Sequence, residues 1–171
     1  MEKNINLAIT LRLKAMLEAT GYRVKMTRES DISIHDQNLD TVKQRKVSDI
    51  KNRLKLIHDT PNCVFISIHQ NHFTESKYNG TQVFYSTNHA DSKIIAERIQ
   101  GQIVSFIQPD NKREIKPATE SIYLLWNTNV PAVLVECGFL SNPSEAQQLK
   151  DPAYQDKIAF SIFCGILHYI N

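Results

Sequence analysis

Apolar residues occur along this chain in two patterns, short continuous runs and longer stretches with helical spacing. Two runs, residues 63–68 and 131–135, are rich in β-branched and aromatic side chains, which is typical of strands in a parallel sheet covered by helices. Each run ends on a side chain able to take part in chemistry, His69 after the first and Glu136 after the second. Because ligands bind beyond the carboxyl ends of such strands, we expect both residues to face one crevice.

Helical spacing predicts three helices over about residues 5–17, 42–57 and 91–107, and a closing helix over about 154–169. Gly21 follows the first of these as a stop signal. The apolar positions assigned to the first helix are Ile5, Ala8, Ile9, Leu11, Ala15, Met16 and Leu17. Those assigned to the second helix are Val42, Val47, Ile50, Leu54 and Ile57.

Two further strands are expected. Residues 22–27 alternate between apolar and polar side chains, and residues 81–85 follow an Asn-Gly turn signal. Strands that alternate with helices predict an α/β fold with an open, mostly parallel sheet and helices on both faces. With 42% hydrophobic and 22% charged residues, the composition is ordinary for one globular domain over residues 1–171.

Charge and cysteine content narrow the function classes. The net charge is +2 and the basic residues are scattered except for a loose cluster at 43–55, so a strong electrostatic case for nucleic acid is missing. No stretch is long and apolar enough for a membrane span, and the first residues lack a signal-peptide pattern. Cys63, Cys137 and Cys164 are interpreted as small buried hydrophobes, not as a disulfide framework.

Ordered motifs over nearly the whole chain indicate a family. The segments that carry the resemblance are residues 2–3, 6–9, 21, 27–31, 45, 52–53, 67–71 and 131–142. In these segments the chain resembles the zinc-dependent N-acetylmuramoyl-L-alanine amidases of the type 3 family, which cut bacterial peptidoglycan. The resemblance implies the family's open α/β sheet, with zinc as the cofactor and a muramoyl-peptide as the substrate.

The resemblance also assigns roles to three residues. Glu2 and His69 fall on two zinc ligands of the family, and Glu136 falls on its catalytic base. The family's first strand and first histidine ligand have no counterpart, so we expect an amino-terminally truncated domain. A catalytic zinc normally has three protein ligands, so two alone would bind it weakly. The lost strand would also leave exposed sheet edges, which invite association with an accessory protein or a second copy.

The activity implied is hydrolysis of the amide bond between N-acetylmuramic acid and L-alanine, with Glu136 as general base toward a zinc-activated water. Residues 43–53, 73–79 and 123–125 are most similar to the germination-specific, spore-cortex subgroup. Action in the cell wall or cortex space follows from the substrate, and the export signal is expected in the missing upstream portion.

Two other functions remain open at this point. One is a non-catalytic peptidoglycan-binding or partner-binding remnant without a complete zinc site. The other is a zinc peptidase, or another amidohydrolase, on a similar open sheet. Zinc content and hydrolysis of muramoyl-peptide against plain peptide separate these readings.

Alternatives also remain for single residues. A carboxylate after five apolar residues is costly to bury without a function or a partner, and a buried ion pair of Glu136 with Arg28 or another basic group is the structural alternative. His72 is the nearest replacement ligand, although a surface loop position is favoured for it. Cys137 is read as packing, not as a nucleophile. Structural or solvated roles are assigned to His35, His58, His89 and His168.

Overall fold

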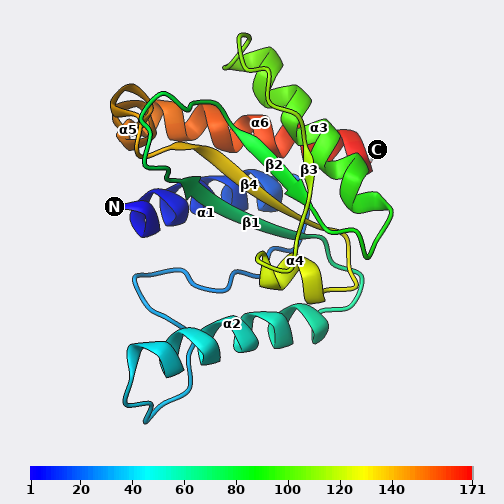
Figure 1. Cartoon of the computed structure of the whole chain (residues 1–171). Helices are drawn as coiled ribbons and strands as arrows, with labels where there is room; N and C mark the ends of the chain where they lie inside the picture. Colours follow the sequence, from blue (N-terminus) through cyan, green and yellow to red (C-terminus); the bar gives the residue numbers. More distant parts are fainter. Residues whose placement is uncertain (171) are drawn as a thin grey trace.

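The computed structural model describes residues 1–170 and shows an α/β fold built on one four-stranded sheet (Figure 1). The strands lie in the order β1-β4-β2-β3. β1 is parallel to β4, β2 is antiparallel to β4, and β3 is parallel to β2. The strand bounds are Phe65–Asn71 for β1, Gln82–Tyr85 for β2, Lys116–Pro117 for β3 and Ala132–Phe139 for β4. The predicted open, mostly parallel sheet is confirmed, with one antiparallel pairing.

The described residues form six helices. Their bounds are Glu2–Ala19 for α1, Val42–His58 for α2, Asp91–Phe106 for α3, Tyr123–Asn127 for α4, Pro143–Lys150 for α5 and Pro152–Ile170 for α6. None of these helices combines the length and the apolar character needed to cross a membrane.

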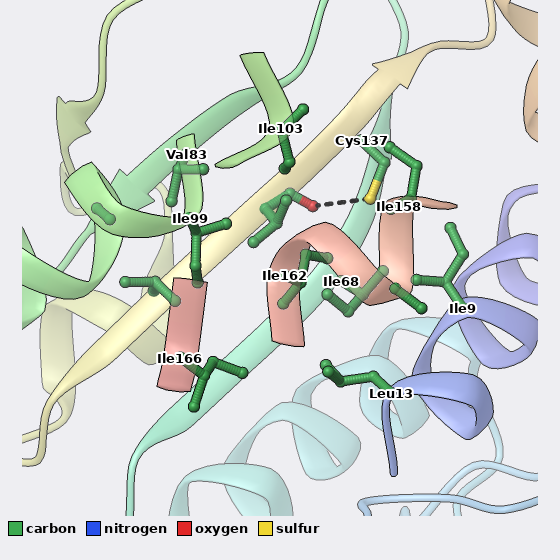
Figure 2. Packing of buried hydrophobic residues seen from close by; sticks show 14 of the residues in the cluster. Ile9, Leu13, Ile68, Val83, Ile99, Ile103, Cys137, Ile158, Ile162 and Ile166 are labelled. Carbon is green, nitrogen blue, oxygen red and sulfur yellow. Dashed lines mark hydrogen bonds between the residues drawn. The ribbon is translucent and has the colours of Figure 1, made fainter. Parts of the chain in front are cut away.

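One face of the sheet carries the main hydrophobic core, which packs against α1, α3 and α6 (Figure 2). In α1 the buried residues are Ile5, Ile9, Leu13 and Leu17, a single row at intervals of four. The predicted positions Leu11 and Ala15 are exposed instead. The expected face was too wide, because α1 packs mainly against α6 and β1, and only one row of its side chains meets them.

The closest approach in this core is between α3 and α6. A Cβ added to Gly165 of α6 would lie 2.6 Å from the Cα of Ile99 in α3. Only glycine leaves room for the two helix backbones at this distance. The region is therefore close-packed and intolerant of added volume.

The opposite face of the sheet is covered much more thinly. Its core consists of Ala118, Leu125, Ala132 and Leu134, under the short helix α4. The longer helix α2 contacts α4 and lies away from the sheet (Figure 1). Val42 and Val47, which the sequence pattern assigned to a buried face, are 61% and 44% exposed. That part of the prediction is wrong because helical spacing does not say whether a partner surface is present.

The strand expected over residues 22–27 does not form among the described residues. The segment passes Tyr22 and Val24 along the edge of the main core, where both are partly buried. Alternation of apolar and polar side chains selects an extended backbone, but a strand also needs a neighbouring edge to supply hydrogen bonds. No such edge pairs with this segment.

Candidate active site

Two candidate residues lie side by side near the carboxyl ends of the parallel strands, which continue beyond them to Asn71 in β1 and Phe139 in β4. His69 of β1 and Glu136 of β4 are partners in the ladder, so both point to the same, thinly covered face of the sheet. The buried residues Ile68 and Val135 directly precede them and point into the main core on the other face. The alternation along both strands thus fixes the side on which the two candidate side chains emerge.

Glu2 reaches the same region from the first turn of α1. Its Oε1 lies 3.1 Å from Nδ1 of His69 and accepts hydrogen bonds from the Asn6 side chain at 3.2 Å and the Gln70 backbone N–H at 3.4 Å. These contacts, led by the one with His69, lower the pKa of Glu2 to about 2. The carboxylate is therefore ionised at any physiological pH.

A further hydrogen bond stabilises the position of Glu2 beside His69. The side-chain amide of Gln70 donates to Oδ1 of Asn6 at 3.1 Å. Asn6 thus connects the strand end at Gln70 to the Glu2 carboxylate, and it orients that carboxylate toward His69. Sequence reasoning assigned no role to either residue beyond membership of a motif, because a polar side chain shows its partner only once the fold is known.

Glu136 is in the opposite electrostatic state. Its Oε2 atom is buried and has no hydrogen-bond partner within residues 1–170. Desolvation raises the pKa of this carboxyl to about 7, with His69 lowering it and the charge of Glu2 raising it. The Arg28 guanidinium donates instead to the backbone oxygens of Lys3 and Ser30. The alternative of a buried ion pair between Glu136 and Arg28 is therefore wrong.

The donors at this site match part of a zinc centre. Zinc ligand atoms at 2.0–2.1 Å in tetrahedral geometry lie about 3.3 Å apart, close to the 3.1 Å between Nδ1 of His69 and Oε1 of Glu2. The two donors therefore fit two corners of one ion in type and spacing. Over residues 1–170 there is, however, no group of three or more His, Cys, Asp or Glu side chains placed to hold a metal.

The remaining candidate residues lie outside this arrangement. His72 is exposed in the loop after β1, where its backbone N–H donates to the Asn71 side chain, as its surface reading predicted. Cys137 is fully buried, and desolvation raises the pKa of its thiol, so it is no nucleophile. The other four histidines are exposed or partly buried: His35, His58, His89 and His168. The rings of His35, His89 and His168 form hydrogen bonds with nearby polar groups.

Comparison with known proteins gives this geometry a family. The sequence model for N-acetylmuramoyl-L-alanine amidase matches residues 1–168. The chain is 37% identical to the germination-specific N-acetylmuramoyl-L-alanine amidase of Bacillus subtilis, over 100% of this chain and 71% of that protein. It is 29% identical to the amidase LytC of the same organism, over 99% of this chain and 31% of that protein.

Solved structures agree with the sequence relatives. The CwlD amidase from Clostridioides difficile, in complex with the GerS lipoprotein, superposes with a TM-score of 0.95 at 44% identity, over 99% of this chain and 86% of that chain. An N-acetylmuramoyl-L-alanine amidase from Clostridium difficile 630 superposes with a TM-score of 0.83 at 29% identity, over 99% of this chain and 84% of that chain. The chain therefore belongs to the N-acetylmuramoyl-L-alanine amidase family.

Proposed function

We propose that this chain hydrolyses the amide bond between N-acetylmuramic acid and L-alanine in peptidoglycan, with Glu136 as the general base. The observation that carries the proposal is the unpartnered Oε2 of Glu136, whose pKa is raised to about 7, beside the Glu2–His69 pair. A general base works best when its pKa lies near the operating pH. Membership of the amidase family supplies the bond that is cut.

In this proposal Glu136 moves one proton twice. It first takes a proton from the attacking water, whose oxygen forms the new bond to the lactyl carbonyl carbon. It then passes that proton to the alanine nitrogen as the carbon–nitrogen bond breaks, so the products are a carboxylic acid and a free amine. The buried position of Glu136 suits both steps, because its two protonation states are close in free energy near neutral pH.

Glu2 and His69 are the residues proposed to hold zinc, which when bound lowers the pKa of a water molecule and polarises the carbonyl. Glu2 brings a permanent negative charge, and Asn6 and Gln70 fix its direction by hydrogen bonds. Such outer contacts set ligand orientation and affinity in metal sites. With two donors from residues 1–170, we expect weaker zinc binding than at a site with three.

The setting of the reaction is also proposed from the relatives. One of them is named germination-specific, and a solved amidase was captured with a lipoprotein. We therefore infer action on spore-cortex peptidoglycan outside the cytoplasmic membrane, with an accessory protein. Preference for glycan from spores over glycan from vegetative walls supports the cortex assignment, and equal activity on both contradicts it.

The replacement Glu136→Gln tests the proposal most directly. It keeps the shape of the side chain and removes the base, so release of stem peptides from muramoyl-peptide should fall about 10²- to 10⁴-fold. Glu97→Gln, at an exposed position on α3, is the matched control and should retain full activity. Undiminished turnover by Glu136→Gln rejects the assigned role, and equal cleavage of plain peptides favours a peptidase instead.

A non-catalytic remnant is the second candidate, and the lack of a three-residue metal group among residues 1–170 favours it. Metal analysis after dialysis against zinc separates the two functions. An amidase should hold about one ion per chain and lose it in Glu2→Gln or His69→Gln. Absence of both zinc and stem-peptide release in the unaltered chain would favour the remnant.

A further inference from the structure

An irregularity in β4 changes what lies beyond Glu136. The β1–β4 ladder pairs His69 with Glu136 but Asn71 with Phe139, so β4 contains one extra residue over this step. Such a bulge shifts the following side chain to the opposite face of the strand. Phe139 therefore emerges on the same face as Glu136, at the end of the sheet where ligands bind in open α/β folds.

Phe139 lies at the bottom of an aromatic cluster at this edge of the sheet. The other two rings are those of Phe73 and Tyr78, from the loop after β1. The ring centroids of Phe73 and Phe139 are 5.2 Å apart, and those of Tyr78 and Phe139 are 6.2 Å apart. Phe139 is completely buried, whereas Phe73 is 45% exposed. The cluster thus gives the loop a fixed position and presents an apolar surface to solvent.

Arg113 connects this cluster to the row of side chains that contains Glu136. Its guanidinium lies over the Phe139 ring, 4.6 Å from the centroid. Its Nε donates to the Asn79 oxygen at 2.6 Å, and its Nη1 donates to Oε1 of Gln82 at 3.3 Å. Gln82 is the ladder partner of Glu136 on β2, so the guanidinium lies one side chain beyond the proposed base. Nη2 has no hydrogen-bond partner in the described part of the chain.

A surface pocket of about 350 Å³ opens beside this guanidinium. Its lining residues are Lys77, Tyr78, Asn79, Asp110, Asn111, Lys112 and Arg113. Three cationic side chains and one carboxylate line the pocket, although the chain as a whole is nearly neutral at +2. Lys77 pairs with Glu75 at 2.5 Å, so the excess positive charge comes from Arg113 and Lys112. A concentration of positive charge next to an exposed aromatic surface fits an anionic organic ligand with apolar parts.

We infer that this pocket binds a carboxylate of the stem peptide while the scissile amide lies at Glu136; the inference rests on the proposed function. In the intact substrate the lactyl carboxyl of N-acetylmuramic acid is tied up in the scissile amide, so the free carboxylates belong to the peptide side of the bond. One strand spacing plus the Gln82 and Arg113 side chains places the guanidinium on the order of 10 Å from Glu136, which two to three extended residues span. The guanidinium fork would bind the carboxylate, and Lys112 would add charge, whereas Lys77 shares its charge with Glu75.

Binding of free stem peptide by calorimetry tests the pocket without any hydrolysis, because this product has no muramoyl–alanine bond left to cut. The unaltered chain should bind peptide with free carboxylates at least about tenfold more tightly than the same peptide with those carboxylates amidated. Arg113→Gln should remove most of this difference. Lys77→Gln combined with Lys112→Gln leaves the Arg113 contacts intact and should reduce the difference by a smaller factor.

Arg98→Gln is the matched control, because it removes one exposed positive charge from α3, which packs against the other face of the sheet. It should keep the full preference for the free carboxylates. Equal affinity for both peptides, or an equal loss in Arg98→Gln, would overturn the pocket assignment. Should Arg113→Gln unfold, as judged by circular dichroism, the lysine pair decides alone, and an unchanged preference there also overturns it.

Hydrolysis of muramoyl-peptides separates this inference from the proposed function. Turnover by the unaltered chain with equal KM for free and amidated substrates would reject the pocket and leave the amidase activity standing. Selective binding of free carboxylates without turnover would reject the activity and support the pocket. If both hold, Arg113→Gln should raise KM for the free-carboxylate substrate about tenfold while kcat changes little.

Discussion

The two faces of the sheet differ in packing and therefore in what they can do. The face under α1, α3 and α6 carries a continuous core, in which the backbones of α3 and α6 meet at Gly165. The other face carries a small cluster of four buried hydrophobic residues at α4, and His69 and Glu136 lie beyond this cluster. One face supplies stability, and the other leaves room for Glu136, His69 and a substrate.

The densely packed face allows the fold to tolerate an unfavourably buried carboxyl on the other face. A carboxyl with a pKa raised to about 7 and an unpartnered oxygen costs folding free energy at neutral pH. The densely packed face can offset that cost because each fully buried large side chain contributes about 1.5–3 kcal/mol. The function proposed for the open face thus depends on packing at the opposite face.

The largest expected effect is a loss of packing on the dense face. Ile99→Ala removes a fully buried side chain at the α3–α6 contact and should lower the free energy of unfolding by about 2–5 kcal/mol. Urea denaturation followed by circular dichroism measures it. A change below about 0.5 kcal/mol, the range of ordinary surface substitutions, would show that this face does not dominate stability.

Removing the charge on the open face should have the next largest effect, in the opposite direction. Since the pKa of Glu136 is about 7 in the folded chain against 4.5 for the free group, the folded state binds the proton more tightly. Stability therefore falls as pH rises from about 4.5 to 7. Relative to the unaltered chain, Glu136→Gln should gain about 3 kcal/mol on going from pH 4 to pH 8.

Denaturation with a chelator present, at both pH values, measures this gain. Glu97→Gln serves again as the control, because its carboxyl is exposed on α3. A difference between Glu136→Gln and the unaltered chain that stays constant with pH would contradict the buried, unpartnered state of this carboxyl. It would also argue against a general base whose pKa lies near neutral pH.

The smallest effect is expected on α2, which adds little to either face. Val47→Ala truncates a side chain that is 44% exposed and should change the free energy of unfolding by no more than about 0.5 kcal/mol. The same urea titration as for Ile99→Ala is the measurement. A loss above about 1.5 kcal/mol would mean that Val47 is buried against another surface, in contrast to its exposed position on α2.

Local patterns predicted the elements well where local composition decides them. The runs before His69 and Glu136 became β1 and β4, and helical spacing placed α1, α2, α3 and α6 close to their observed bounds. The same reasoning failed for residues 22–27 and for the exposed valines of α2. In both cases the sequence specified a backbone shape or an apolar side chain, but not the partner surface that would use it.

In the candidate site, too, some features followed from local sequence patterns and others only from the tertiary structure. The apolar runs placed His69 and Glu136 at strand ends, and family resemblance supplied Glu2. The contribution of Asn6, and the link from Gln82 to Arg113, depend on which segments lie together. The position of Phe139 depends on a bulge in the ladder, which no local pattern announced.

The sequence by itself determined the α/β class, the two strands that carry the candidate residues His69 and Glu136, and the family. Only the tertiary structure decided that Glu2 contacts His69 across 67 positions of the chain, and that Glu136 is buried without a partner. The physical reason is that hydrophobic periodicity acts over a few neighbouring residues, whereas hydrogen bonding, desolvation and pKa depend on distances between atoms remote in the chain.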